Sequence, residues 1–140
     1  MKNVNSESTM QGAGILMIIG GIIAGITGIA SVINAASASV GAQTSTLFAA
    51  ACLTFACGLI AMISGVIGVN HSKNHEKAGL CMLWGAVTIA LSLGGTILSA
   101  VGGQSFSVVN LVFGILLPTL YILAAANNRT ASKDPAMQNG

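Results

Sequence analysis

Charged side chains are nearly missing from this sequence. Only 6% of its 140 residues are Asp, Glu, Lys or Arg, whereas soluble domains carry about 25%. None of these residues occurs from Ser8 to Ser72, or from Ala78 to Asn128. A soluble fold built from this chain would have almost nothing charged to present to water. The formal net charge of +2 is also too small and too scattered to predict a nucleic-acid partner.

Catalytic and proton-carrying groups are missing from the apolar stretches as well. Proton-coupled transporters need an ionisable residue inside their membrane spans. The apolar stretches of this chain supply no Asp, Glu, Lys, Arg or His. Ser, Thr and Cys do occur in these stretches, but no His, Lys or Asp accompanies them to form a catalytic dyad. We therefore expect a protein that is not an enzyme and that uses no cofactor and no metal.

Cysteine and aromatic residues are few. Cys52, Cys57 and Cys81 all lie in apolar runs. Cys52 and Cys57 are five residues apart, so on one helix they point in different directions and cannot form a disulfide. We interpret all three as small packing residues. The aromatic share of 4% and the 18 glycines are typical of tightly packed membrane helices.

Four apolar runs are each long enough to cross a bilayer, which takes roughly 20 residues per pass. Lipid forces the backbone to satisfy its own hydrogen bonds, and no run alternates with a period of two, so each should be a helix. We predict an all-α, four-helix transmembrane bundle. The runs are 12–36, 46–69, 78–101 and 106–126, with a polar, flexible tail at 1–11 and a disordered cytoplasmic tail at 127–140.

The cations indicate how the helices are oriented. All five lie in the two tails or in the 70–77 connection: Lys2, Lys73, Lys77, Arg129 and Lys133. Positively charged connections stay in the cytoplasm, so the sequence predicts that both termini and this connection are cytoplasmic. Trp84 and Tyr121 lie one to two turns inside the predicted cytoplasmic helix ends, where aromatic side chains gather at the membrane interface.

The first run has a competing interpretation as a secretion signal. Ala36–Ser37–Ala38 resembles a cleavage site. However, the run is longer than the apolar core of a signal peptide, and the tail before it is nearly neutral. We expect a retained helix, with cleavage as the alternative.

Small residues recur at helical spacing and mark candidate packing faces. Such faces let two helix backbones approach closely in lipid. They predict internal packing of the bundle or, alternatively, contact between copies of the chain. The candidates are Gly20, Gly21, Ala24, Gly25, Gly28, Ala61 and Gly65.

A stripe of hydroxyl side chains runs along the third predicted helix. Thr88, Ser92, Thr96 and Ser99 share one helix face at spacings of three and four. Such a stripe can line a water path, but more often its hydroxyls bond to the carbonyl one turn earlier or join two helices.

The fourth predicted helix carries Asn110 and Pro118. Pro118 lacks an N–H and its ring crowds the carbonyl of Gly114, so we expect a kink and a free acceptor. We expect Asn110 to hydrogen-bond to a neighbouring helix, with a ligand or ion contact as the alternative.

Two histidines in the charged connection raise the question of a metal site. His71 and His75 are four residues apart and would share a face if a helix continued through them. They stand beside Lys73 and Lys77, which disfavour a cation. We therefore interpret the segment as a hydrated loop.

Two segments together resemble a known class of proteins. They are GLIAMISGVIGVNHSKNHEKAGLCMLWGAV, a Gly-rich helix, cationic turn and helix, and NLVFGILLPTLYILAAANNR, an apolar helix ending in Asn–Asn–Arg. The pattern resembles the small four-helix membrane proteins of Gram-positive bacteria that are grouped as domains of unknown function. The likeness covers roughly 47–129 and rests on hydropathy and small-residue spacing. It implies a bacterial plasma membrane and no established activity.

These observations predict a non-enzymatic membrane component, either an accessory subunit or a self-assembling unit. Its partners would be the lipid bilayer and a second copy or another membrane protein. The alternative is a small pore or passive transporter that uses the hydroxyl stripe, Asn110 and the Pro118 kink.

Overall fold

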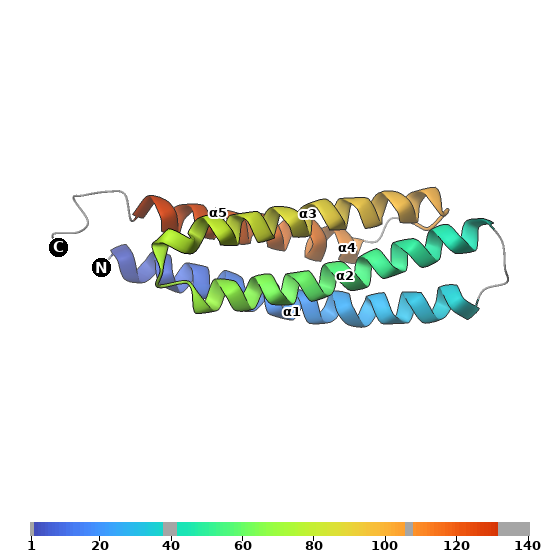
Figure 1. The fold of residues 1–140 in the computed structure, drawn as a ribbon, viewed down its shortest axis with the longest axis horizontal. Helices are drawn as coiled ribbons and strands as arrows, with labels where there is room; N and C mark the ends of the chain where they lie inside the picture. The colour runs from blue at the N-terminus through green and yellow to red at the C-terminus, as the bar shows by residue number, and fades with distance from the viewer. Residues whose placement is uncertain (1, 38–41, 106–107, 132–140) are drawn as a thin grey trace.

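The computed structural model describes residues 2–37, 42–105 and 108–131. Within these ranges the chain forms four helical rods packed into an elongated bundle, and no strand is present there (Figure 1). The all-α, four-helix prediction is confirmed for this part of the chain. The rods are α1 (Lys2–Ser37), α2 (Ala42–Asn70), α3 (Ala78–Val101) and a composite of α4 (Val108–Leu111), η2 (Val112–Leu116) and α5 (Leu117–Ala131), with a short 3-10 turn η1 (His75–Lys77) before α3.

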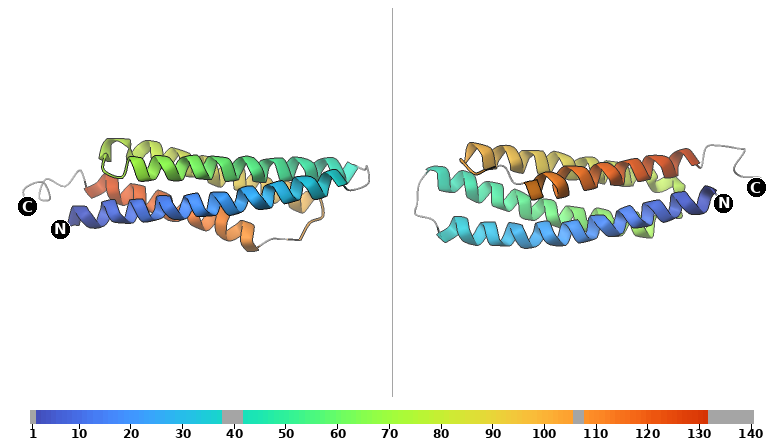
Figure 2. Two further views of the ribbon diagram at one scale, coloured as in Figure 1. Left: turned by 90° about the horizontal axis from the view of Figure 1, so that it is seen from below. Right: turned by 180° about the vertical axis from the view of Figure 1, so that it is seen from behind.

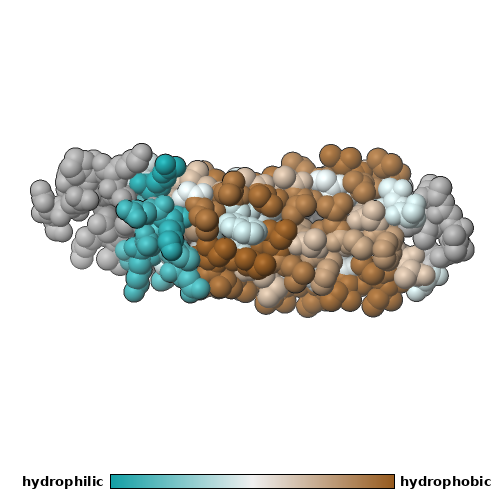
Figure 3. Space-filling view, viewed as in Figure 1, coloured by the Kyte–Doolittle hydropathy of each residue, from teal (hydrophilic) through white to brown (hydrophobic). Residues whose placement is uncertain are grey.

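The two ends of the bundle differ in character. The start of α1, the end of α5 and the connection from α2 to α3 lie together at one end, called the terminal end below (Figures 1 and 2). Hydrophilic side chains gather at that end, while the rest of the visible surface is mainly apolar (Figure 3). The opposite end, called the distal end, carries the turn after α3.

Within the described residues, three helices are long and apolar enough to cross a membrane. They span Asn5–Ser37, Ser45–Asn70 and Ala78–Val101. The bounds predicted for the third run are those of α3. Large apolar side chains are exposed along all the rods, far beyond the small patches that soluble monomers leave open. The chain therefore has the surface of a membrane protein.

The turn after α3 depends on one glycine in a left-handed conformation. Gly103 has φ of 79°. Its N–H donates to the Ala100 carbonyl at 3.1 Å, and the N–H of Gln104 donates to the Ser99 carbonyl at 3.0 Å. This pattern satisfies the last carbonyls of the helix and reverses the chain within a few residues.

The predicted flexible tail at 1–11 is wrong from residue 2 onward. α1 begins at Lys2, ten residues before the predicted start at Gly12. Met10 explains the extension, because it is fully buried and packs in one cluster with Met17 and Tyr121. Burying this side chain stabilises helix in a segment whose other residues are mostly polar.

The predicted disordered tail at 127–140 is wrong up to residue 131, and residues 132–140 lie outside the described part. α5 continues to Ala131. Asn128 is fully buried, and its Nδ2 donates to the Ser72 carbonyl at 3.0 Å and to the Met10 sulfur at 3.2 Å. These contacts join α5 to α1 and to the connection that follows α2.

The fourth rod differs from the uniform helix predicted at 106–126. Residues 106–107 are not described. The rod then contains a π-helical turn, Val112–Leu116, which ends directly before Leu117 and Pro118 at the start of α5. The N–H of Leu117 bonds to the carbonyl of Val112, five residues back. Pro118 has no N–H to donate to Gly114, so the local change of hydrogen-bond register fits the disruption that proline imposes.

Glycines hold α1 and α2 in close antiparallel contact. Gly14, Gly21 and Gly28 recur every seven residues on α1, so they lie on one helix face. A Cβ at Gly21 would lie 2.8 Å from the Gly58 carbonyl oxygen, and one at Gly28 would lie 2.7 Å from the Phe55 nitrogen. Only a residue without a side chain fits at these positions.

Candidate functional site

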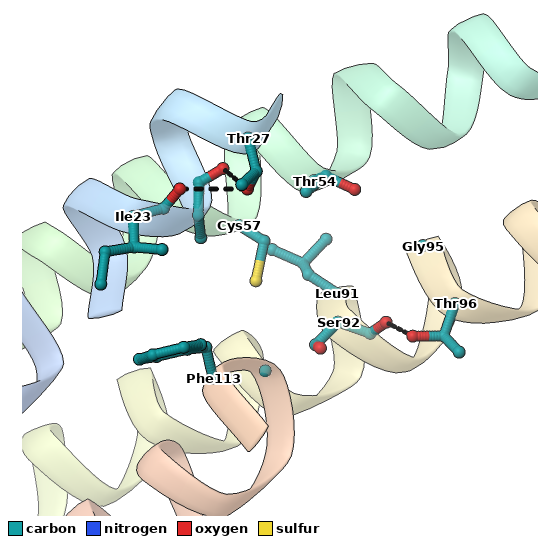
Figure 4. Close-up of a pocket in the computed structure, with 11 residues that line it drawn as sticks. Ile23, Thr27, Thr54, Cys57, Leu91, Ser92, Gly95, Thr96 and Phe113 are labelled. Atoms are coloured by element: carbon teal, nitrogen blue, oxygen red, sulfur yellow. Dashed lines mark hydrogen bonds between the residues drawn. The ribbon is translucent and has the colours of Figure 1, made fainter. Parts of the chain in front are cut away.

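Two cavities lie inside the bundle between its middle and its distal end. The inner cavity, of about 30 Å³, lies between α1, α2, α3 and η2 (Figure 4). The outer cavity, of about 160 Å³, lies between α1, α2, α3 and the turn that follows α3. Thr54 of α2 lines both cavities.

The walls of these cavities are rich in hydroxyl groups. Thr27, Ser92 and Thr96 line the inner cavity, and Ser31 and Ser99 line the outer one. Asn34 and Gln104, both exposed, contribute amide groups to the outer cavity. Among the described residues that line either cavity, no side chain is a carboxylate, amine, guanidinium or imidazole. The site is therefore polar and uncharged.

Several of these hydroxyls donate to the backbone one turn earlier. Thr27 donates to the Ile23 carbonyl at 3.0 Å, Ser31 to the Thr27 carbonyl at 2.8 Å, and Thr54 to the Ala50 carbonyl at 3.0 Å. A hydroxyl has one donor and two acceptor lone pairs, so its oxygen can still accept. The cavity walls consequently offer more acceptors than donors.

The predicted hydroxyl stripe of α3 is divided between different surroundings. Ser92 and Thr96 line the inner cavity and Ser99 lines the outer cavity. Thr88 is buried outside both, and its hydroxyl donates to the Trp84 carbonyl at 2.9 Å. Thr96 likewise donates to the Ser92 carbonyl at 2.9 Å. Thr88 and Thr96 thus bond to the backbone carbonyl one turn earlier, as hydroxyls in membrane helices more often do than line a water path.

The fourth rod contributes to the site mainly through η2. Phe113 and Gly114 line the inner cavity. Gly114 lies so close to Ser92 that an added Cβ would overlap the Ser92 hydroxyl. Pro118 is fully buried and lines neither cavity. The side chain of Asn110 lies outside the described residues.

Sequence reasoning missed the contributions of α1 and α2. Thr27, Ser31 and Asn34 recur at helical spacing, which is the same signal that singled out the α3 stripe. Thr54 and Cys57 carry no comparable pattern on α2, so only the packing of the helices places them at the cavities.

A packed apolar cluster separates the cavities from the terminal end. It centres on Tyr121, which is fully buried and donates from its hydroxyl to the Ser64 carbonyl at 2.7 Å. A Cβ at Gly68 would meet this ring at 2.5 Å, and one at Gly85 would meet it at 3.2 Å. Tyr121, which was predicted to be an interface aromatic, does not turn its ring to lipid, because these two glycines admit the ring to the core of the bundle. The other buried members are Met10, Met17, Ala61, Cys81 and Ala125.

The candidate packing residues lie inside the bundle. Gly21, Gly28 and Gly65 lie at the α1–α2 contact, and a Cβ at Gly20 would meet Leu117 at 2.6 Å. Gly25 is half-buried, and a Cβ at Gly58 would lie 2.6 Å from its nitrogen. The remaining two candidates are Ala24, which lines the inner cavity, and Ala61, which belongs to the Tyr121 cluster.

Side chains that could hold a metal ion do not gather in the part of the chain that the structure describes. No three His, Cys, Asp or Glu residues lie together there. His71 contacts the Ile67 carbonyl through Nδ1 at 3.0 Å and the Lys77 ammonium through Nε2 at 3.4 Å, while the side chain of His75 is not described. All three cysteines are free, which agrees with the prediction that Cys52 and Cys57 do not pair.

Comparison with known proteins adds no relative. No protein-family model, no curated protein and no solved structure matches the chain.

Proposed function

We propose that this chain is a four-span integral protein of a bacterial cytoplasmic membrane that acts without catalysis, as an accessory subunit or a self-assembling unit. Both termini and the 70–77 connection would lie in the cytoplasm. The gathering of hydrophilic side chains at the terminal end supports this orientation (Figure 3). The resemblance of 47–129 to small membrane proteins of Gram-positive bacteria supports the location.

One surface feature carries the proposal that the chain recognises its partner inside the membrane. Isoleucines on α1 repeat at alternating spacings of four and three, and each is between 44% and 63% exposed. This is the period with which two supercoiled helices meet, and β-branched side chains at such positions pack with little loss of rotamer freedom. The isoleucine stripe consists of Ile15, Ile19, Ile22, Ile26, Ile29 and Ile33.

The small size of the polar connections supports the same proposal. The described link from α2 to α3 has only seven residues, His71 to Lys77, so it offers little surface to a soluble partner. A partner would instead meet the chain along its apolar faces, where close side-chain packing drives helix association in lipid.

Native mass spectrometry of the protein released gently from its own membrane tests the proposal. We expect a defined homo-oligomer or a reproducible complex with another membrane protein. A chain that is recovered only as a lipid-bound monomer, across a range of mild detergents, would contradict it.

The second candidate is a small pore or passive transporter, and the two cavities favour it. The Tyr121 cluster opposes it, because a path through one chain would have to open this packed region. Ser92→Leu and Asn110→Leu discriminate between the candidates. They should abolish solute flux in liposomes if a path exists, and should leave complex formation intact if the chain is an accessory subunit.

A further inference from the structure

We propose that the outer and inner cavities form a blind, water-filled vestibule that opens at the distal end and binds a small uncharged molecule rich in hydrogen-bond donors. Thr54 stands at the junction of the two cavities and contacts the ligand. Only the sidedness of the vestibule, its opening on the outer membrane face, rests on the proposed function.

The dimensions and the mouth of the outer cavity support access from water. A water molecule needs roughly 10–15 Å³ of such space, so a cavity of about 160 Å³ has room for several. Asn34 and Gln104 lie at this end, and both are exposed. Polar walls keep water in a cavity of this size, whereas apolar walls would leave it dry.

The hydrogen bonds of the walls determine which ligand fits. Thr27, Ser31, Thr54 and Thr96 already donate to backbone carbonyls, so their oxygens can only accept from a ligand. A molecule that presents several O–H or N–H groups would satisfy these acceptors. A polyol or an amide such as urea has this chemistry.

The lack of charge on the walls argues for an uncharged ligand. An ion that entered would lose its hydration shell, and the described lining residues carry no opposite charge to compensate. Phe113 lines the inner cavity, and the packed Tyr121 cluster lies beyond it toward the terminal end. These two features end the vestibule in mid-bundle, so it binds a solute rather than conducting one.

Cysteine reactivity in membranes tests whether the vestibule is wet. Single cysteines are introduced as Ser31→Cys and Ser64→Cys in a chain with Cys52, Cys57 and Cys81 changed to Ala. Methyl methanethiosulfonate, a small uncharged reagent, reacts with the thiolate and so depends on local water. We expect Ser31→Cys to react at least about tenfold faster than Ser64→Cys, which replaces a fully buried residue. Equal rates would overturn the vestibule.

The unmodified protein supplies a second readout that needs no substitution. Cys57 lines the inner cavity, whereas Cys81 is fully buried in the Tyr121 cluster. Mass spectrometry of the labelled chain should show modification of Cys57 before Cys81. The reverse order would contradict access to the inner cavity, even if the single-cysteine variants failed to fold.

Protection by a solute tests the ligand class. Glycerol near its dissociation constant should slow the labelling of Ser31→Cys about twofold. It should leave the labelling of Lys73→Cys, in the exposed connection at the terminal end, unchanged. Adding Thr54→Val, which keeps the side-chain shape but removes the acceptor, should abolish this protection. Protection by sodium chloride at equal osmolality, in place of glycerol, would overturn the assignment of an uncharged ligand.

A separate measurement tests the sidedness alone. A membrane-impermeant, charged thiol reagent added to intact cells should label Gln104→Cys and not Lys73→Cys. The opposite result would overturn the proposed orientation and place the mouth in the cytoplasm. The uncharged reagent crosses the membrane, so its rates would still report on the vestibule.

Discussion

The hydroxyl of Tyr121 donates a hydrogen bond of 2.7 Å to the carbonyl oxygen of Ser64, 57 residues earlier in the chain. This bond joins α5 to α2 at the centre of the packed cluster that separates the cavities from the terminal end. In an apolar setting, a buried hydroxyl without a partner is costly, so this contact favours one rotation of α5 over others.

Removing this hydroxyl should destabilise the bundle without changing its shape. We expect Tyr121→Phe to lower the free energy of unfolding by about 1–2 kcal/mol, because one buried hydrogen bond is lost. Thermal unfolding in a mild detergent measures the change. Thr119→Val is the matched control, since the exposed Thr119 hydroxyl bonds only to its own helix. Equal losses for both variants would contradict a special role for the Tyr121 bond.

The contact between α1 and α2 should be sensitive to a single methyl group. A Cβ at Gly28 would lie 2.7 Å from backbone atoms of Phe55, which cannot move aside as a flexible side chain would. We expect Gly28→Ala to destabilise the protein by roughly 1–3 kcal/mol through overpacking.

Gly12 provides the control for this prediction, because an added Cβ there would meet nothing within 4 Å. Gly12→Ala should be neutral or stabilising by up to about 1 kcal/mol, since alanine favours helix. Both changes are measured by the same thermal unfolding. A stable Gly28→Ala variant would show that the two helices lie farther apart than described.

The terminal end should loosen when Asn128 is shortened. Asn128→Ala removes the bond from Nδ2 to the Ser72 carbonyl and the contact with the Met10 sulfur. We expect a loss of about 1–3 kcal/mol, and faster hydrogen exchange in the first turns of α1 and in the connection that follows α2. The exposed neighbour is the control, and Asn127→Ala should change stability by less than about 0.5 kcal/mol. Unchanged exchange in α1 would refute the link.

The isoleucine stripe should matter for assembly and not for folding. Changing Ile22, Ile26 and Ile29 to Ala should weaken complex formation at least about tenfold, which is 1.4 kcal/mol. Leu83, Leu93 and Ile97 on α3 are similarly exposed, at 63%, 44% and 62%, and their change to Ala is the control. Native mass spectrometry compares the two triple variants. An equal effect of both would indicate that the α1 stripe faces only lipid.

Much of the fold was predictable because a bilayer tolerates so little charge. The two long uncharged stretches and the charged link between them predicted the helix count, and the bounds of α3 agree with the structure. The extensions of α1 and α5 were not predictable. They depend on Met10 and Asn128, which lie 118 residues apart and are stabilised by each other.

The candidate site was predictable only in part, for a similar reason. The spacing of Ser92, Thr96 and Ser99 on one helix face is visible in the sequence. The sequence does not show that Ser92 and Thr96 share one cavity wall with Thr27, or that Ser99 shares another with Ser31. Thr54 lines both cavities. These arrangements require the rotations of three helices about their axes. Those rotations are set by close contacts such as Gly21 with Gly58 and Gly28 with Phe55.

By itself, the sequence determined the class of this protein: an all-helical bundle whose surface suits lipid. Hydropathy and charge are properties of single residues, so they can be read from the sequence without knowing any tertiary contact. The tertiary structure alone decided that Tyr121 lies in the core, that Asn128 is buried, and that hydroxyls of three helices line two cavities. Each of these outcomes depends on contacts between distant segments, which close packing selects and local pattern does not encode.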